Sequence, residues 1–213
     1  MPLLALPTHH IDYIAESIAE QGYAIVPEFF PPSFISLLRE EALALQEKGK
    51  LKQASIGQAE LNQLDHRIRG DLIHWLDYED QANTTQQHFA ATMEALREAL
   101  NRHFYLGLFE LEQHFAIYPP GAIYRKHLDQ FRGNEERQVS CILYLNQGWK
   151  EEYGGQLRLY LNGEAAEPYI DTVPMGGTLV VFLSGRFWHE VLPASRPRIS
   201  LTGWFRKRGA SLT

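Results

Sequence analysis

The chain has 213 residues, enough for one domain with a sizeable hydrophobic core. Its formal net charge of −6 argues against non-specific binding to nucleic acid or to an acidic membrane, because both need a basic surface. The single cysteine, Cys141, excludes an internal disulfide and any multi-cysteine metal site. No apolar run reaches the length of a transmembrane helix. We therefore expect a cytoplasmic protein without nucleic-acid or membrane partners, either monomeric or weakly oligomeric.

The first half of the chain is dominated by helical patterns. Apolar residues at helical spacing predict three helices, over about residues 9–21, 31–48 and 84–103. A short strand is predicted between the first two helices, over residues 23–26. Thr84 and Gln87 form a capping-box pattern that predicts the start of the third helix. Residues 49–70 lack a clean period and predict a long mobile loop. The segment Arg69-Gly70-Asp71 predicts a turn that leads into a strand.

From Glu110 onward the pattern changes to short runs separated by glycine-containing turns. The predicted strands cover about residues 111–118, 123–129, 138–145, 156–161, 177–183, 188–191 and 198–206. Helices followed by many closely spaced strands favour an α+β fold, in which N-terminal helices pack outside a double-stranded β-helix, or jelly roll. We expect a single domain over residues 1–213. Residues 1–109 would form a helical and substrate-loop support region, and residues 110–208 the jelly-roll core.

Two histidines and one aspartate are candidate metal ligands. Side chains alternate along a strand, so His127 and Asp129 project from the same face of their predicted strand. His189 lies far enough along the chain to return on another strand. Two His and one carboxylate on one side of a metal are typical of non-haem Fe(II) oxygenases. Alone, His-x-Asp is weak evidence, because the helical segment His10-Ile11-Asp12 has the same spacing.

Arg198 strengthens the metal hypothesis. It follows His189 by nine residues, on a predicted strand whose other residues include the apolar Ile199 and Leu201. A buried arginine can bind a carboxylate through two hydrogen bonds, whereas the alternative is a surface cation on the last strand. Tyr144 could add a phenol hydrogen bond. This order of motifs resembles the Fe(II)/2-oxoglutarate dioxygenases: His-x-Asp comes first, then a distant His, then Arg-x-Ser.

A closer resemblance comes from an ordered set of short motifs. It covers Arg69-Gly70-Asp71 with Trp75, Tyr118-Pro119-Pro120-Gly121, Tyr124-x-x-His127-x-Asp129, Ser140-Cys141-Ile142-x-Tyr144-Leu145-Asn146, Gly154-Gly155-x-Leu157-Arg158, His189-Glu190-Val191-x-Pro193-Ala194, and Arg198 through Trp204. In this order the motifs resemble the prolyl hydroxylases of the hypoxia-sensing type and their bacterial relatives. The resemblance spans about residues 69–206.

The resemblance implies roles for the residues around the metal. Tyr144 and Arg198 would bind the C5 carboxylate of 2-oxoglutarate. Tyr118, Tyr124 and Thr202 would line the iron pocket, with Tyr124 on the side of the substrate. The implied cofactors are Fe(II), with 2-oxoglutarate and O₂ as co-substrates and ascorbate as reductant. Arg198, together with the three metal ligands, would form the catalytic set.

The resemblance also implies a substrate site. Trp204 and Val191 would shape the wall near the substrate proline, and Asp71 and Arg137 would form an ion pair at the entrance. Residues 49–70 would cover the bound substrate. The implied reaction is C4 hydroxylation of a prolyl residue in a protein or peptide, with release of succinate and CO₂. A translation factor is a plausible target, as in bacterial relatives, and the chain departs from the animal members by lacking a zinc-finger module.

Other functions share parts of this pattern. A 2-oxoglutarate hydroxylase of a small molecule or free amino acid would use the same three ligands. A nucleic-acid demethylase is disfavoured by the acidic balance, and a halogenase would need a small residue in place of Asp129. A non-catalytic metal-binding jelly-roll module is the alternative of another class. Arg198 and Tyr144 argue against it, because such a module needs no buried dicarboxylate clamp.

Overall fold

Eleven strands form two antiparallel sheets in the part of the chain that the computed structural model describes, residues 8–54, 68–76, 83–130 and 135–209. The larger sheet contains, in order, β1 (Tyr23–Val26), β9 (Leu179–Leu183), β6 (Arg137–Tyr144), β11 (Arg198–Lys207), β4 (Leu108–Tyr118), β3 (Leu72–Trp75) and β2 (Lys52–Gln53). The smaller sheet contains β5 (Tyr124–His127), β10 (His189–Val191), β7 (Leu157–Tyr160) and β8 (Tyr169–Thr172).

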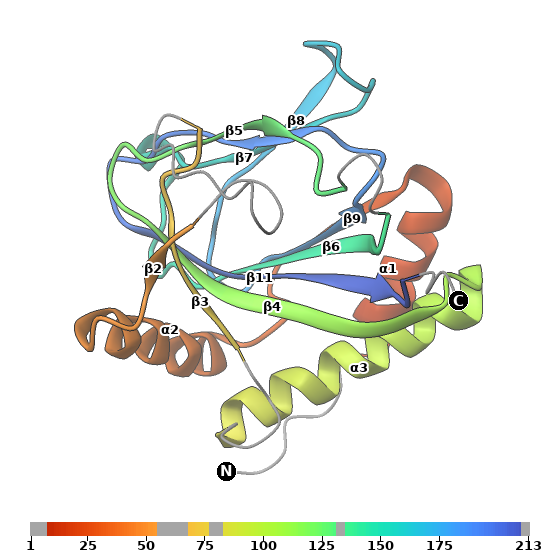
Figure 1. Cartoon of the computed structure of the whole chain (residues 1–213), viewed down its shortest axis with the longest axis horizontal. Helices are drawn as coiled ribbons and strands as arrows, with labels where there is room; N and C mark the ends of the chain where they lie inside the picture. The colour runs from red at the N-terminus through yellow and green to blue at the C-terminus, as the bar shows by residue number, and fades with distance from the viewer. Residues whose placement is uncertain (1–7, 55–67, 77–82, 131–134, 210–213) are drawn as a thin grey trace.

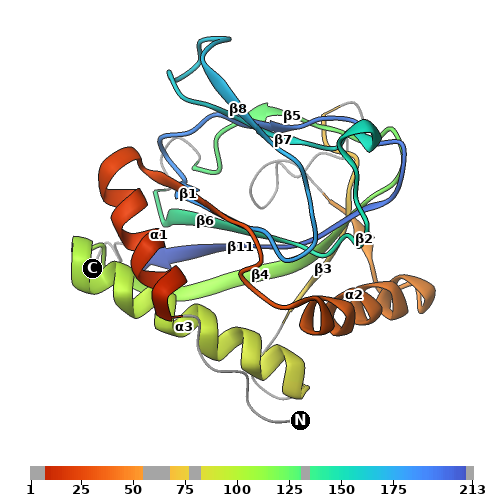
Figure 2. The same ribbon diagram turned by 180° about the vertical axis from the view of Figure 1, so that it is seen from behind.

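Three helices cover the outer face of the larger sheet, and the smaller sheet lies on its other side (Figures 1 and 2). They are α1 (Thr8–Gln21), α2 (Pro32–Glu47) and α3 (Thr84–Phe104). The arrangement confirms the predicted α+β jelly roll with helices packed outside it. Among the described helices, none is long and apolar enough to cross a bilayer.

Side-chain alternation along the central strands separates two buried layers. From β11 and β6, the residues Ile199, Leu201, Phe205, Val139, Cys141 and Leu143 join the hydrophobic core beneath the helices. The alternate positions face the smaller sheet, and they include Ile142 and Tyr144 in a second core. The same inner face carries buried polar residues, among them Arg198, Ser200 and Ser140. A polar pocket between the sheets is therefore specified by every second residue of these strands.

The predicted helices and strands are present, with differences at their ends. The predicted capping box is wrong by one residue. Asn83 is the N-cap of α3, and its side-chain oxygen accepts a hydrogen bond from the Gln86 backbone N–H at 2.9 Å. Sequence analysis missed β8, an edge strand with exposed positions, and β2, whose two residues are too few to show a period. Of the predicted loop, residues 55–67 lie outside the described residues.

The larger sheet includes strands from the region before residue 110, where the jelly-roll core was expected to begin. Strands β1, β2 and β3 all precede it, yet each pairs within the larger sheet. β1 pairs along its whole length with β9, and β3 pairs with β4. The N-terminal part of the chain therefore contributes three strands to the sheet as well as the helices that cover it.

Candidate active site

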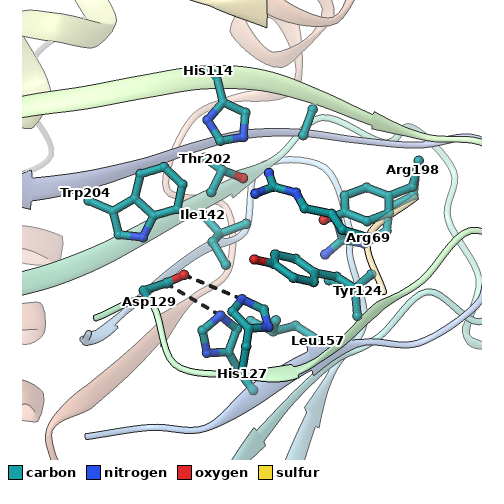
Figure 3. Close-up of a pocket in the computed structure, with 14 residues that line it drawn as sticks. Arg69, His114, Tyr124, His127, Asp129, Ile142, Leu157, Arg198, Thr202 and Trp204 are labelled. Carbon is teal, nitrogen blue, oxygen red and sulfur yellow. Dashed lines mark ion pairs between the residues drawn. The ribbon is translucent and has the colours of Figure 1, made fainter. Parts of the chain in front are cut away.

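A pocket lies between the inner faces of the two sheets, and Figure 3 shows its lining. Sequence analysis gave a role to nine of the residues that line it, which are Tyr118, Tyr124, His127, Asp129, His189, Val191, Arg198, Thr202 and Trp204. Arg69, His114, Ala116, Ile142 and Leu157 complete the lining. The pocket therefore gathers residues from both sheets and from the segment before β3.

The three candidate metal ligands converge at one end of the pocket. His127 ends β5, His189 begins β10, and the two residues are direct partners across these antiparallel strands. Asp129 follows two residues after β5. Its carboxylate oxygens lie 3.6 Å from His127 Nε2 and 3.5 Å from His189 Nε2 (Figure 3). One ligand atom from each of the three residues lies within 4.8 Å of the others, so the group can hold a single metal ion.

Main-chain carbonyls orient both imidazoles. The Nδ1 atom of His127 lies 2.7 Å from the Arg125 carbonyl oxygen, and that of His189 lies 3.0 Å from the Phe187 carbonyl oxygen. Since a carbonyl only accepts, each Nδ1 carries the proton and each Nε2 keeps its lone pair for a metal. Burial and the neighbouring His127 lower the pKa of His189 to about 4, so this imidazole is neutral near pH 7.

The carboxylate ligand is also held by the protein. Ser140 on β6 donates a hydrogen bond to Asp129 Oδ2 at 2.7 Å, and its hydroxyl oxygen lies 2.9 Å from that of Ser184. Burial alone would raise the pKa of Asp129, but the two histidines and Ser140 lower it below the ordinary value. Asp129 is therefore ionised and ready to bind a cation.

A buried anion-binding group lies at the other end of the pocket. Arg198 is only 2% exposed, and its Nε donates to the Gly155 carbonyl oxygen at 2.9 Å. Its Nη2 and the hydroxyl of Tyr144 are both buried without a hydrogen-bond partner in the part of the chain that the structure describes. The guanidinium carbon lies 5.0 Å from the centre of the Tyr144 ring. A donor fork beside an unpartnered phenol fits the far carboxylate of a dicarboxylate such as 2-oxoglutarate.

The backbone at Gly155 makes room for this arginine. Gly155 has a φ of +74°, and a Cβ atom there would lie 3.3 Å from Arg198 Cδ and 3.0 Å from Ala194 Cβ. Any other residue would combine backbone strain with these close contacts. Tyr118 lies opposite Arg198 across β4 and β11, with its ring centre 5.2 Å from the guanidinium carbon. Gly155 thus has a steric role beyond the turn predicted from sequence.

The predicted ion pair between Asp71 and Arg137 is wrong. Asp71 is buried and pairs with Arg69, whose Nε and Nη2 donate to its two oxygens at 2.8 and 3.0 Å. Arg137 instead donates to Glu112 at 2.6 Å and lies over the Trp204 ring, 3.7 Å from its centre. Asp71 and Arg137 therefore each have a partner other than the predicted one.

Sequence analysis missed the role of Arg69 at the pocket. Its guanidinium lies 4.7 Å from the centre of the Tyr124 ring, which in turn stacks on His127 with ring centres 3.6 Å apart. The Arg69-Gly70-Asp71 motif was noticed, but only Asp71 was given a role. The sequence did contain a signal for this role of Arg69. It lies two residues from Asp71, and in an extended chain this spacing places both side chains on the same side.

The remaining predicted residues lie along the pocket walls. Thr202 on β11 is partly buried, with its hydroxyl oxygen 3.2 Å from that of Ser200. Val191 on β10 and Trp204 on β11 are buried on opposite sheets. His114, which sequence analysis missed, lies opposite Thr202 on β4. It shares the inner face of β4 with Ala116 and Tyr118 at every second position.

Comparisons with known proteins agree with this geometry. The model of the 2OG-Fe(II) oxygenase superfamily, where 2OG is 2-oxoglutarate, matches residues 113–206. A crystal structure of a prolyl-4-hydroxylase from Pseudomonas putida shares 44% identity and a TM-score of 0.81, covering 93% of this chain and 100% of that chain. The chain belongs to the prolyl hydroxylase family of 2OG-Fe(II) oxygenases.

More distant prolyl hydroxylases match most of this chain. Egl nine homolog 1 of Homo sapiens is 29% identical over 202 residues, which are 92% of this chain and 46% of that protein. The chain spans about half the length of the curated relatives it matches first. A prolyl hydroxylase from Trichoplax adhaerens, solved with a peptide fragment of hypoxia-inducible factor, has a TM-score of 0.82 at 27% identity. The match covers 93% of this chain and 90% of the Trichoplax adhaerens chain.

Proposed function

We propose that this protein hydroxylates a prolyl residue of a protein or peptide at C4, with Fe(II) as cofactor and 2-oxoglutarate and O₂ as co-substrates. Succinate and CO₂ would be the other products. One observation carries the proposal. The lining of a single pocket includes three converging metal ligands and the buried Arg198, and the Tyr144 phenol lies beside that arginine with its hydroxyl also unpartnered among the described residues. A metal-binding module without oxygenase activity has no use for that arginine and phenol.

In this proposal His127, Asp129 and His189 hold the iron. The donor set suits a divalent cation, since the ionised Asp129 carboxylate lies beside imidazole nitrogens, and the His189 imidazole is neutral. Bound Fe(II), with 2-oxoglutarate and O₂, supplies the C–H hydroxylation chemistry. The protein contributes by orienting the ligands through the Arg125 and Phe187 carbonyls and by excluding bulk water from a buried pocket.

Arg198 and Tyr144 are proposed to bind the C5 carboxylate of 2-oxoglutarate. The Arg198 fork is fixed by Gly155, so binding requires little further ordering of the side chain. Burial raises the pKa of Tyr144, while the cationic Arg198 opposes that rise, and the phenol keeps its proton near pH 7. It can therefore donate to a carboxylate oxygen. Tyr118 and Thr202 would line the same cavity, between this end and the metal ligands.

The proposed substrate is a polypeptide. The Pseudomonas putida enzyme and the Trichoplax adhaerens complex support this class, because one is a prolyl-4-hydroxylase and the other holds a peptide. The walls suit a proline ring, which is apolar and lacks an N–H. Trp204, Val191 and Tyr124 would form them. A translation factor is the candidate target that the resemblance to bacterial relatives implies, with ascorbate keeping the iron reduced.

The test is succinate formation from 2-oxoglutarate by the Fe(II)-loaded protein, with and without synthetic peptides that contain one central proline. The same assay is run with purified translation factors. We expect turnover that one of these polypeptides stimulates, together with the mass of one added oxygen on its proline and 4-hydroxyproline after hydrolysis. Turnover stimulated only by free amino acids or other small molecules would replace the polypeptide with a small-molecule substrate. No binding of 2-oxoglutarate would overturn the enzymatic function.

A further inference from the structure

Unpartnered polar atoms mark two places in the pocket. Within the described residues, five buried side-chain nitrogen or oxygen atoms lack a hydrogen-bond partner. Two of them, Tyr144 Oη and Arg198 Nη2, are accounted for by the proposed co-substrate. Two more, His114 Nδ1 and Trp204 Nε1, belong to residues that line the same pocket farther along β4 and β11. The fifth is on His10, in α1. The pair at His114 and Trp204 calls for a second ligand group.

His114 is held in a fixed orientation. It is 1% exposed and lies opposite Thr202 across β4 and β11. Its ring makes an edge contact with Trp75 at 4.7 Å between centres and a tilted contact with Trp204 at 5.4 Å. Trp75 is 48% exposed, so the row of three rings runs from the protein surface to the pocket wall. Figure 3 shows His114 above Thr202, away from the metal ligands.

The imidazole of His114 is neutral. Burial lowers its pKa well below the ordinary value of 6.5, and the cations Arg69 and Arg137 lower it further, against the opposing effect of Asp129. A neutral imidazole carries one proton, on either nitrogen. With the proton on Nδ1, the unpartnered atom becomes a hydrogen-bond donor, like the indole Nε1–H of Trp204. The lining of the pocket then offers two donors, on His114 and Trp204, that have no hydrogen-bond partner among the described residues.

The chemistry of a prolyl peptide matches two donors. The peptide unit before proline has a carbonyl oxygen but no N–H, and proline contributes a second carbonyl oxygen. Main-chain groups nearest the ring are therefore acceptors only. We propose that His114 is a substrate-binding residue, which donates a hydrogen bond to a main-chain carbonyl oxygen beside the target proline. This inference rests on the proposed function, and it assigns the polypeptide main chain to the part of the pocket beside His114.

The experiment compares His114→Leu, His114→Asn and His114→Gln with the unaltered protein. The Asn amide can place an N–H near the Nδ1 position, whereas the Gln amide reaches the Nε2 position. The probe is the single-proline peptide that the unaltered protein hydroxylates fastest. We expect His114→Leu to raise the KM for this peptide by about five- to tenfold, the range for one lost hydrogen bond. The KM for 2-oxoglutarate should stay within about twofold.

A second readout separates substrate binding from a general structural effect. In His114→Leu, more succinate should form per hydroxyproline, because a loosely held peptide leaves part of the turnover uncoupled. His114→Asn should restore the peptide KM and the coupling better than His114→Gln. The matched control is His74→Leu on β3, since His74 bonds only the Lys50 carbonyl and does not line the pocket. It should leave both KM values unchanged.

Several results would overturn the inference. They are an unchanged peptide KM in His114→Leu, an equal rise in the KM for 2-oxoglutarate, or equal behaviour of the Asn and Gln variants. Thermal melting and 2-oxoglutarate binding check folding. If His114→Leu does not fold, the Asn and Gln comparison alone decides. If the unaltered protein hydroxylates no prolyl peptide, the proposed function falls together with this inference, whereas peptide turnover that is insensitive to His114 removes only the inference.

Discussion

The two ends of the pocket differ in how the protein satisfies their polar atoms. At the metal end, both imidazoles donate to main-chain carbonyls and the carboxylate accepts from Ser140. At the anion end, Arg198 keeps one hydrogen bond to Gly155, while its Nη2 and the Tyr144 hydroxyl have none. The metal end is oriented by the protein alone, and the anion end is completed only by a ligand.

This difference has an energetic consequence. A buried polar atom without a partner costs about 1–3 kcal/mol, so the anion end destabilises the protein until a carboxylate binds there. Binding then recovers that free energy in addition to the charge interaction. The metal ligands carry no such penalty. They depend on one another, because two imidazoles and one carboxylate must bind the same ion. Substitutions of the metal ligands should therefore abolish function, whereas those at the anion end should act on co-substrate affinity.

The largest effect is expected from Asp129→Ala. The variant removes the only charged ligand and leaves Ser140 without its acceptor. Loss of a group that merely supports a ligand costs about 10–100-fold in metal affinity or activity, and loss of the ligand itself should exceed that range. Fe(II) binding by calorimetry and succinate formation should both fall to background. Retained Fe(II)-dependent turnover would show that the metal binds elsewhere.

Arg198→Ala should raise the 2-oxoglutarate requirement and spare the metal. Removing one partner of a buried charged contact costs about 2–5 kcal/mol, which corresponds to a rise in KM of about thirtyfold or more. Fe(II) affinity should stay nearly unchanged, because Arg198 does not contact the metal ligands. Arg198→Lys should recover only part of the loss, since lysine keeps the charge without the fork.

The control for that variant is Arg158→Ala. Arg158 pairs with Asp171 through two hydrogen bonds, but both residues are partly exposed and belong to β7 and β8, outside the pocket. It should leave the KM for 2-oxoglutarate unchanged. A large rise in KM for both variants would mean that loss of stability explains the effect, and an unchanged KM in Arg198→Ala would contradict the clamp.

Ser140→Ala tests whether orientation at the metal end comes from the protein. The variant leaves the ligands in place but removes the 2.7 Å hydrogen bond to Asp129. We expect Fe(II) affinity to fall by about 10–100-fold, with the KM for 2-oxoglutarate measured at saturating Fe(II) unchanged. Ser195→Ala, which removes an exposed hydroxyl bonded to the Tyr153 carbonyl, is the matched control. Equal Fe(II) affinity in both variants would show that Asp129 needs no support.

The contrast between the two ends also explains what sequence could predict. The apolar neighbours of Arg198 favoured a buried cation, and alternation along one strand predicted that His127 and Asp129 project together. The fold followed from helical periods before residue 104 and short alternating runs after it. These signals are local in sequence, and the resemblance to a known family connected them into one site.

Contacts between distant segments were not predictable in this way. Asp71 and Arg137 have opposite charges, but each pairs with another residue. Arg69 is two residues from Asp71, and Glu112 on β4 reaches Arg137 on β6 across the intervening strand β11. His114 gave no signal because one histidine in a strand is usually packing. Its place in the pocket depends on the register that sets it opposite Thr202. Register and side-chain competition are properties of the folded chain.

The smallest and most discriminating effect is expected from Tyr144→Phe. The variant removes a buried hydroxyl that has no hydrogen-bond partner among the described residues, so the ligand-free form should melt at the same or a higher temperature. Its KM for 2-oxoglutarate should nevertheless rise, by about tenfold for one hydrogen bond to a charged group. Tyr160→Phe is the opposite case, because the Tyr160 hydroxyl donates to Glu190 at 2.5 Å outside the pocket. That variant should lose stability and keep its KM. If Tyr144→Phe behaved like Tyr160→Phe, the anion end would be satisfied within the protein, and the contrast between the two ends would be wrong.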